Sequence, residues 1–344
     1  MGKTYYAIVA QLVEQRTENP CVTGSIPVFG TIINNCMTPI KFYGIGFNDP
    51  QDFVVSWNLG NSCNWKCEYC PTYLNDGSVY WIDNEVVKRV LLQLKNHFPD
   101  RQLRVEFTGG EVTTKPDFID LMTFCKEQGF KNHIVTNASR TVAYWERLAP
   151  YLYSAICTFH PANADREHYE KIVDTMLMHG CHPILSLAMV KDMFWDLVEY
   201  KKYLEEKYRN KAHVDIIMIY DKEQTKSFNG YFYDYDKDQR EYLSFHAGKN
   251  YVMEYIDGTR RELSTAELQD ENLNNFSGFL CGSKLNMISI DYLGGASISV
   301  CSQRKPININ SENFDEMLTP KICQASACRN PSDLRILKIR PEQA

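Results

Sequence analysis

Long apolar runs, low-complexity segments, internal repeats and a marked excess of one charge are all missing from this sequence of 344 residues. No stretch approaches the roughly 18 consecutive apolar residues of a membrane-spanning helix, so we expect no membrane partner. A hydrophobic content of 44% excludes a disordered chain, and the sequence has neither collagen-like nor coiled-coil repeats. The net charge of −6 makes nucleic acid an improbable partner, although a local basic patch could still hide within it. We therefore expect a soluble protein with one large core or two smaller ones.

Cysteine is the residue type that carries information here. The chain has 12 cysteines and lacks the basic start and continuous apolar core of a signal peptide. Disulfide scaffolds belong to small secreted proteins, so this pattern predicts cytoplasmic thiols that serve metal or redox chemistry.

Residues 1–36 differ from the rest of the chain. Segments 16–20 and 23–28 can be back-translated into DNA whose ends pair around a loop, and residues 9–14 fit the arm that would precede them. Three arms in this order are typical of a transfer-RNA gene, so we expect Met37 to be the native start. Residues 1–36 are then a non-native extension, or disordered. A genuine extension that packs as a strand is the alternative.

Apolar strands alternate with amphipathic helices from residue 53 onward, which predicts βα units around a parallel sheet. The predicted strands are 53–59, 103–107, 133–136, 154–159, 184–190 and 214–220, and helices 116–129, 141–150, 166–179 and 194–208 lie between the later ones. The fold class is therefore α/β, with a partial (β/α)6 TIM-like barrel over residues 44–222. Right-handed crossovers place the loops that follow the strands on one face.

The alternation of strands and helices stops after Tyr220. Residues 223–277 are predicted to form a polar, aromatic-rich connecting loop and a hairpin over 251–263 that turns at Asp257-Gly258. Ser264 is expected to cap a short helix. Residues 278–340 should form a small C-terminal β-hairpin domain that carries the last four cysteines. The run 231–235 either lines a substrate mouth or packs as an ordinary loop.

The loop after the first predicted strand holds Cys63, Cys67 and Cys70 in the spacing C-x3-C-x2-C. Three thiolates on one short loop can hold three irons of a 4Fe-4S cluster and leave the fourth iron open to an outside ligand. A zinc site is the alternative, but the nearest histidine, His97, lies well along the following helix.

A second motif, Gly109-Gly110-Glu111, ends the next predicted strand. Glycines allow close approach of the backbone to a ligand, and a carboxylate suits an ammonium group. Alone, this segment would be an ordinary turn with a solvated acid.

Together, the two motifs resemble those of the radical S-adenosylmethionine (SAM) enzymes. The resemblance implies that the cysteine loop binds a SAM-binding 4Fe-4S cluster, with Tyr69 as the aromatic residue before the third cysteine. It implies that Gly109, Gly110 and Glu111 contact SAM, which the cluster cleaves to a 5′-deoxyadenosyl radical. It also implies a flavodoxin- or ferredoxin-type electron donor. Weaker positional matches suggest cofactor contacts at the ends of later strands: Asn137, Thr158, Ser186 and Tyr220. His160 stands where many members carry aspartate, and its role stays open.

The tail carries Cys281, Cys301, Cys323 and Cys328. Two thiolates on a hairpin, turning near Asp291 and Gly294-Gly295, and two on a returning segment can surround a cluster. This arrangement resembles the twitch domain, a shortened SPASM extension, and implies one auxiliary 4Fe-4S cluster that relays electrons. A zinc site is the alternative.

The other cysteines of the barrel, Cys125, Cys157 and Cys181, are expected to be buried core residues. The catalytic acid or base stays unassigned. Glu254, Asp257 and Asp291 are candidates, with solvated surface as the default interpretation of each.

The overall prediction is a radical SAM oxidoreductase that abstracts hydrogen from a substrate carbon. We expect a small-molecule substrate such as a carbohydrate or amino alcohol. The alternatives are a peptide-modifying maturase and a non-catalytic iron-sulfur or zinc scaffold.

Overall fold

The computed structural model describes residues 38–45, 52–219, 232–246, 248–282, 287–297, 307–308, 320–328 and 331–343. The predictions made for residues 1–36 lie outside these ranges. Within them, no helix combines the length and the apolar character that crossing a membrane requires.

The larger sheet is a partial barrel that surrounds a hollow interior, the lumen. Within the described residues it has nine strands in the order β13-β12-β11-β2-β3-β4-β5-β6-β7. Its six consecutive parallel strands confirm the predicted α/β fold. They are β2 (Asp52–Asn58), β3 (Gln102–Thr108), β4 (Lys131–Thr136), β5 (Ser154–Phe159), β6 (His182–Ala188) and β7 (His213–Ile217).

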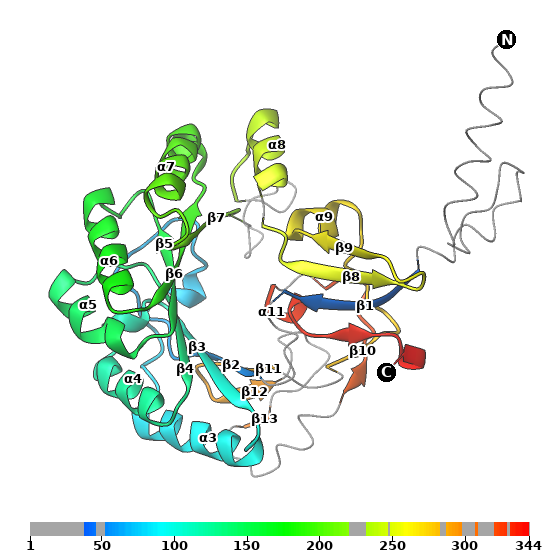
Figure 1. Cartoon of the computed structure of the whole chain (residues 1–344), viewed down its shortest axis with the longest axis horizontal. Helices are drawn as coiled ribbons and strands as arrows, with labels where there is room; N and C mark the ends of the chain where they lie inside the picture. Colours follow the sequence, from blue (N-terminus) through cyan, green and yellow to red (C-terminus); the bar gives the residue numbers. More distant parts are fainter. Residues whose placement is uncertain are drawn as a thin grey trace, which may run out of the picture.

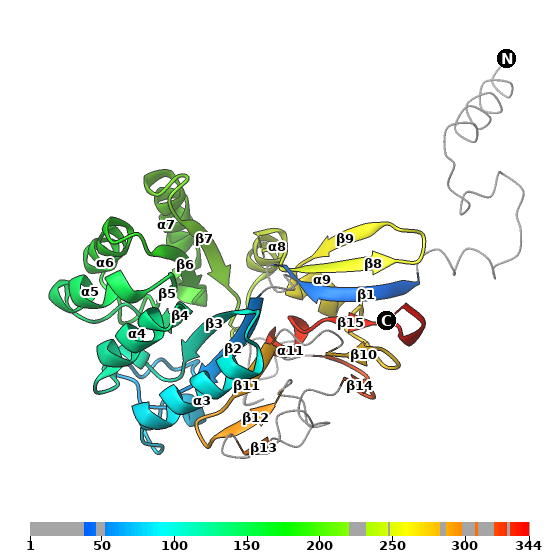
Figure 2. The same cartoon turned by 60° about the horizontal axis from the view of Figure 1, so that its bottom comes forward.

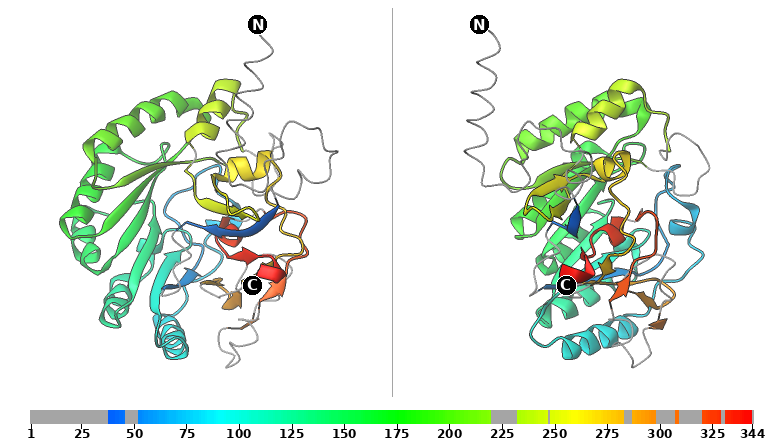
Figure 3. Two further views of the ribbon diagram at one scale, coloured as in Figure 1. Left: turned by 45° about the vertical axis from the view of Figure 1, so that its right-hand side comes forward. Right: turned by 90° about the vertical axis from the view of Figure 1, so that its right-hand side faces the viewer.

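Helices cover the convex outer face of this sheet (Figures 1 and 3). They are α3 (Asn84–His97), α4 (Phe118–Glu127), α5 (Val142–Leu148), α6 (Arg166–Met178) and α7 (Phe194–Lys207). Helix α3 shows why they form: Asp83 accepts a hydrogen bond from the Glu85 amide at 2.7 Å, which caps the helix. The apolar residues of its inner face are fully buried against the sheet.

Side chains alternate along each strand, so every second residue faces the lumen. The strand register aligns five polar lumen residues in one row, here named the lower layer: Ser56, Glu106, His133, Ser154 and His182. Further along the strands, an upper layer contains Thr158, Ser186 and Asp215. The upper layer lies toward the carboxyl ends of the strands, the end that carries the cysteine loop.

A second, antiparallel sheet lies beside the open side of the barrel (Figures 2 and 3). Within the described residues its strand order is β14-β10-β15-β1-β8-β9. The strands are β1 (Pro39–Gly44), β8 (Tyr251–Tyr255), β9 (Arg260–Leu263), β10 (Leu280–Cys281), β14 (Lys321–Ile322) and β15 (Lys338–Ile339). The predicted hairpin is β8–β9. Ser264 caps α9 (Thr265–Asp270) as predicted, because its hydroxyl accepts from the Glu267 amide at 3.2 Å.

Three features of the fold differ from the expectation. The segment predicted as a polar loop contains α8 (Lys237–His246), whose apolar side is too narrow to be found from periodicity. Strand β1 precedes the predicted barrel and pairs with β8 and β15. The tail hairpin of β11 (Met287–Ile290) and β12 (Gly295–Ser297) joins the barrel, since β11 pairs in parallel with β2. The structure also describes β13 (Ile307–Asn308) and α11 (Pro331–Leu334).

Candidate active site

The loop Cys63–Cys70 follows β2 and carries three half-buried thiols. The Cys63 sulfur accepts from the Trp65 amide at 3.4 Å, and the Cys67 sulfur accepts from the Asn163 side chain at 3.4 Å. A backbone bond from the Cys70 amide to the Cys67 carbonyl, 3.0 Å long, closes a turn between these two cysteines. The loop thus has a defined backbone path with its sulfurs close to polar hydrogens.

The Gly-Gly-Glu segment lies directly against this loop. The Gly110 amide donates to the Gly60 carbonyl at 3.0 Å, and the Glu111 amide donates to the Ser62 carbonyl at 2.8 Å. A β-carbon at Gly110 would lie 2.0 Å from the Ser62 carbonyl oxygen. Only glycine fits this position, so the second motif holds the start of the first in place.

The Glu111 carboxylate points into the protein. It is 1% exposed and accepts from the Asn137 amide, the Thr136 hydroxyl, and both the amide and the hydroxyl of Thr113, at 2.6 to 3.0 Å. Burial raises its pKa, whereas these donors lower it. The carboxylate therefore ties the ends of β3 and β4 together. The SAM contact predicted for Glu111 remains a prediction.

Aromatic side chains pack over the cysteine loop. The Tyr69 hydroxyl hydrogen-bonds to Nδ1 of His160 at 2.7 Å, and the two rings stack at 5.9 Å. From the aromatic run, Tyr233 donates to the Glu68 carboxylate at 2.6 Å. Tyr235 is 1% exposed and bonds to a backbone carbonyl, so it packs as an ordinary core residue. Tyr233 instead contacts the cysteine loop from the segment that follows β7, the last of the six parallel strands.

The remaining predicted contacts surround the same end of the lumen. The Asn137 side chain donates to Asn64 at 3.0 Å and lies 4.0 Å from the Cys63 sulfur. Thr158 and Ser186 are adjacent in the upper layer. Tyr220 lies outside the described residues.

Asp215 is a candidate that the sequence analysis missed. It pairs in register with Ser186, so its carboxyl group belongs to the upper layer. Burial raises the pKa of its carboxyl group, whereas a hydrogen bond from the Ile216 amide lowers it. The sequence alone carried no signal, because a polar residue between the apolar Val214 and Ile216 is the ordinary alternation of a strand.

Burial also shifts the pKa of three other groups at the loop. It raises the pKa of the Cys63 and Cys67 thiols, and it lowers the pKa of His160 to about 4. Thiols bind metal as thiolates, so a bound cluster would displace their protons. Three sulfurs on one loop, with amide donors beside two of them, suit an iron-sulfur cluster. Among the described residues, no three His, Cys, Asp or Glu side chains form a site for a single metal ion.

Three of the four tail cysteines lie around the second sheet. Cys281 ends β10, and Cys323 follows β14, with its amide bonded to the Phe279 carbonyl at 2.7 Å. The antiparallel register places both side chains on one face. Burial raises the pKa of Cys328 to about 12, and the thiols of Cys281 and Cys323 contribute to this rise. The three thiols therefore lie within electrostatic range of one another, while Cys301 lies outside the described residues.

The candidate acids lie elsewhere. Glu254 pairs with Lys41 and Arg260 in the second sheet, and Asp257 and Asp291 accept backbone amides in tight turns. The predicted turn at Asp291 is confirmed. None of the three belongs to the lower or the upper layer of the lumen. Each instead stabilises the sheet or turn that contains it. Cys125, Cys157 and Cys181 are buried, as predicted.

Residues 57–223 match the radical SAM superfamily. The match covers the barrel strands β3 to β7 and the cysteine loop. A curated relative, an S-adenosylmethionine-dependent nucleotide dehydratase of Pseudoalteromonas ulvae, is 32% identical over 104 residues, which cover 25% of this chain and 33% of that protein. The chain thus spans about one third of the length of this relative.

Two solved structures are similar to this one. Streptococcus suis SuiB bound to the precursor peptide SuiA has a TM-score of 0.53 at 15% identity, covering 92% of this chain and 76% of that one. The enzyme anSMEcpe with bound AdoMet has a TM-score of 0.52 at 14% identity, covering 78% of this chain and 80% of that one. At this identity the likeness shows a shared fold.

Proposed function

We propose that this protein is a radical SAM oxidoreductase that removes hydrogen from an unreactive carbon of a small molecule. The observation that carries the proposal is the union of the cysteine loop with the Gly-Gly-Glu segment through two backbone hydrogen bonds. When bound, the cluster and SAM supply a 5′-deoxyadenosyl radical at the carboxyl end of the barrel.

The residues of this chain have three tasks in the proposal. Cys63, Cys67 and Cys70 hold the cluster. The Gly109-Gly110 backbone approaches the methionyl group, and Asn137, Thr158 and Ser186 orient the rest of SAM. Tyr69 and Tyr233 close over the loop and exclude water, which protects a reactive radical from side reactions.

The tail serves electron transfer in this proposal. Cys281, Cys323 and Cys328, with Cys301, would hold an auxiliary 4Fe-4S cluster. Loss of one hydrogen atom leaves the substrate as a radical. An auxiliary cluster held by these cysteines would supply an acceptor for the electron that a substrate radical must lose, together with a proton, to complete a two-electron oxidation. The register of β10 and β14, which places Cys281 and Cys323 on one face of the second sheet, supports this assignment.

The test is anaerobic SAM cleavage by the reconstituted, reduced protein. We expect 5′-deoxyadenosine from the wild type and none from Cys67→Ala. The matched control is Cys181→Ala, which removes a thiol that is 1% exposed and lies outside both sets. Failure of the wild type to release 5′-deoxyadenosine would favour the scaffold alternative and reject the proposal.

A further inference from the structure

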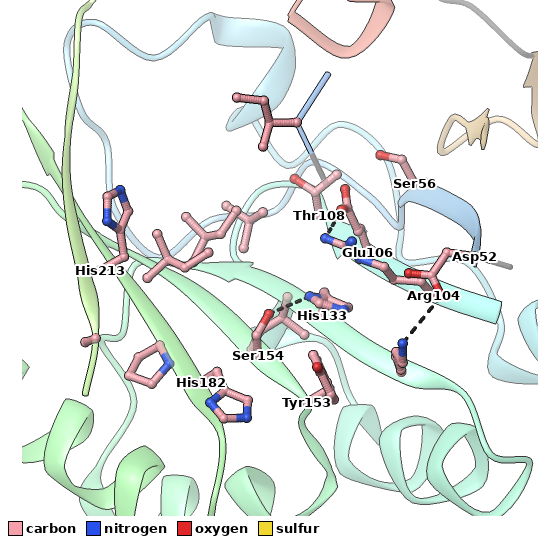
Figure 4. Close-up of a pocket in the computed structure, with 18 of the residues that line it drawn as sticks. Asp52, Ser56, Arg104, Glu106, Thr108, His133, Tyr153, Ser154, His182 and His213 are labelled. Atoms are coloured by element: carbon pink, nitrogen blue, oxygen red, sulfur yellow. Dashed lines mark hydrogen bonds and ion pairs between the residues drawn. The ribbon is translucent and has the colours of Figure 1, made fainter. Parts of the chain in front are cut away.

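A cavity of about 1040 Å³ occupies the lumen toward the amino ends of the barrel strands (Figure 4). The whole lower layer lines it, and Thr108, the last residue of β3, marks its extent toward the carboxyl end. The cavity therefore continues along the lumen from the amino ends of the strands to the residue that precedes Gly109.

The lining is basic although the chain is acidic. Its charged side chains are four cations and two acids: Arg104, Lys131, Lys211, Arg335, Asp52 and Glu106. Three histidines, His133, His182 and His213, add further nitrogen donors. With a net charge of −6 for the chain, this local excess of positive charge favours an anion.

The two acids already have cationic partners. Glu106 lies 3.6 Å from Arg104 and 3.2 Å from Arg335, which comes from the C-terminal segment. Asp52 lies 3.4 Å from Lys131. Arginine presents several donors at once, so Arg104 and Arg335 can turn part of their guanidinium groups toward an anion that competes with Glu106.

His133 supplies an unsatisfied polar atom at the centre of the lower layer. Its Nδ1 hydrogen-bonds to the Ser154 hydroxyl, whereas its buried Nε2 has no hydrogen-bond partner among the described residues. When Ser154 donates to Nδ1, the ring hydrogen resides on Nε2, which is then a free donor. Burial, with repulsion from Arg104 and Lys131, lowers the pKa of His133 to about 3, in keeping with a positive potential.

A row that is apolar except for His213, which pairs with Ile184, separates this region from the upper layer. Val135, Ile156 and Ile184 lie in register between the two polar layers. Ser154 and Thr158, one from each layer, are four residues apart, or roughly 13 Å along a strand. A molecule that spans the lumen would place a charged end in the lower layer and a carbon atom beside the upper one.

We propose that this cavity binds a phosphate group of the substrate, so that the substrate is a phosphorylated small molecule. The inference rests on the proposed function for the reaction, but the binding can be measured without it. A phosphate offers three or more terminal oxygens to donors arriving from β3, β4 and the C-terminal segment, whereas a carboxylate offers only two oxygens. The cavity is at the upper end of the range for small-ligand sites.

Calorimetry on the reconstituted protein with inorganic pyrophosphate tests the inference, with malonate at equal ionic strength as the carboxylate probe. We expect pyrophosphate to bind at least about tenfold more tightly than malonate. Arg104→Gln should weaken pyrophosphate binding about tenfold or more, because a charge-assisted hydrogen bond is lost. Glu106→Gln should strengthen it, because the competing carboxylate is gone.

Arg147→Gln is the matched control, since Arg147 is exposed on α5 outside the cavity. Opposite effects of the Arg104 and Glu106 variants, with no change in the control, support a phosphate site. Equal weakening in all three variants, or no binding of pyrophosphate by the wild type, overturns it. SAM cleavage by the wild type is measured on the same sample. Cleavage without pyrophosphate binding rejects only this inference, and binding without cleavage rejects only the proposed reaction.

Discussion

The two cysteine sets are built in different ways. Cys63, Cys67 and Cys70 lie within eight residues of one loop, and two backbone bonds from the neighbouring strand fix the start of that loop. The tail cysteines come from separate segments: the end of β10, the residue after β14, and the stretch before α11. One set depends on local sequence, and the other depends on a sheet that must form first.

This difference has consequences for stability. A short loop loses little chain entropy when it closes around a cluster, whereas segments distant in sequence lose more. We therefore expect the first set to bind iron even when the second is damaged. We also expect the tail cysteines to bind iron when the cysteine loop is damaged, provided that the barrel still folds.

The largest effect should come from Gly110→Ala, which separates the two motifs of the barrel. Its β-carbon would meet the Ser62 carbonyl at 2.0 Å, so the cysteine loop must shift. We expect loss of about four of about eight irons per reconstituted chain and loss of 5′-deoxyadenosine. Iron analysis and product chromatography measure these results. The control is Gly180→Ala, because Gly180 has open space around it, so a β-carbon there meets no other atom and only the backbone penalty at φ +75° applies. Full iron content in Gly110→Ala would contradict the proposal that the Gly-Gly-Glu segment holds the cysteine loop in place.

Cys328→Ser tests the tail set alone. We expect about half of the iron to be lost while SAM cleavage persists, because the loop cysteines belong to the barrel, on the segment that follows β2. Substrate oxidation should stop, since the remaining electron has no acceptor. Iron analysis with electron paramagnetic resonance of the reduced protein distinguishes the two clusters. Zinc in the wild-type tail in place of iron would reject the electron-relay role.

Glu111→Gln should destabilise the barrel without removing a cluster ligand. In this variant an NH2 group replaces one of the two carboxylate oxygens. That NH2 group would face either the Asn137 amide or the amide and hydroxyl of Thr113, which are donors that now bond to the lost oxygen. A buried unsatisfied donor costs about 1–3 kcal/mol. Urea unfolding of the apoprotein measures the loss, with the exposed Glu85→Gln as control. If the loss of unfolding free energy is no larger than that of the control, the hydrogen bonds of Glu111 do not stabilise the barrel.

Much of the barrel could be predicted because its signals are local. Strand β5 has the predicted bounds, and the turns at Asp257-Gly258 and Asp291 were identified from turn residues alone. Strand β1 could not be found this way, since it pairs with β8 and β15, more than 200 residues away in sequence. Asp215 and the lower layer were missed for a related reason. Their meaning depends on which side chains share a row of the sheet, and only the register between strands determines this.

The smallest expected effect is a change in the pH dependence of stability, and it tests whether the cysteine loop is ordered before it binds metal. Burial lowers the pKa of His160 to about 4, against an ordinary value of about 6.5, while it packs on Tyr69. Between these pH values the unfolded chain binds a proton that the folded chain does not. The stability that His160 contributes is therefore fully present above pH 6.5 and falls as the pH drops toward 4, by at most about 1.4 kcal/mol per pH unit for this group.

In the apoprotein, His160→Gln should make the fall in unfolding free energy between pH 6.5 and 4.5 less steep. The His133→Gln variant alters a histidine in the lower layer, far from the loop, and should reduce the slope independently. If only His133→Gln changes the slope, His160 is solvated in the apoprotein. The cysteine loop would then need its metal to fold, although its three ligands are close in sequence.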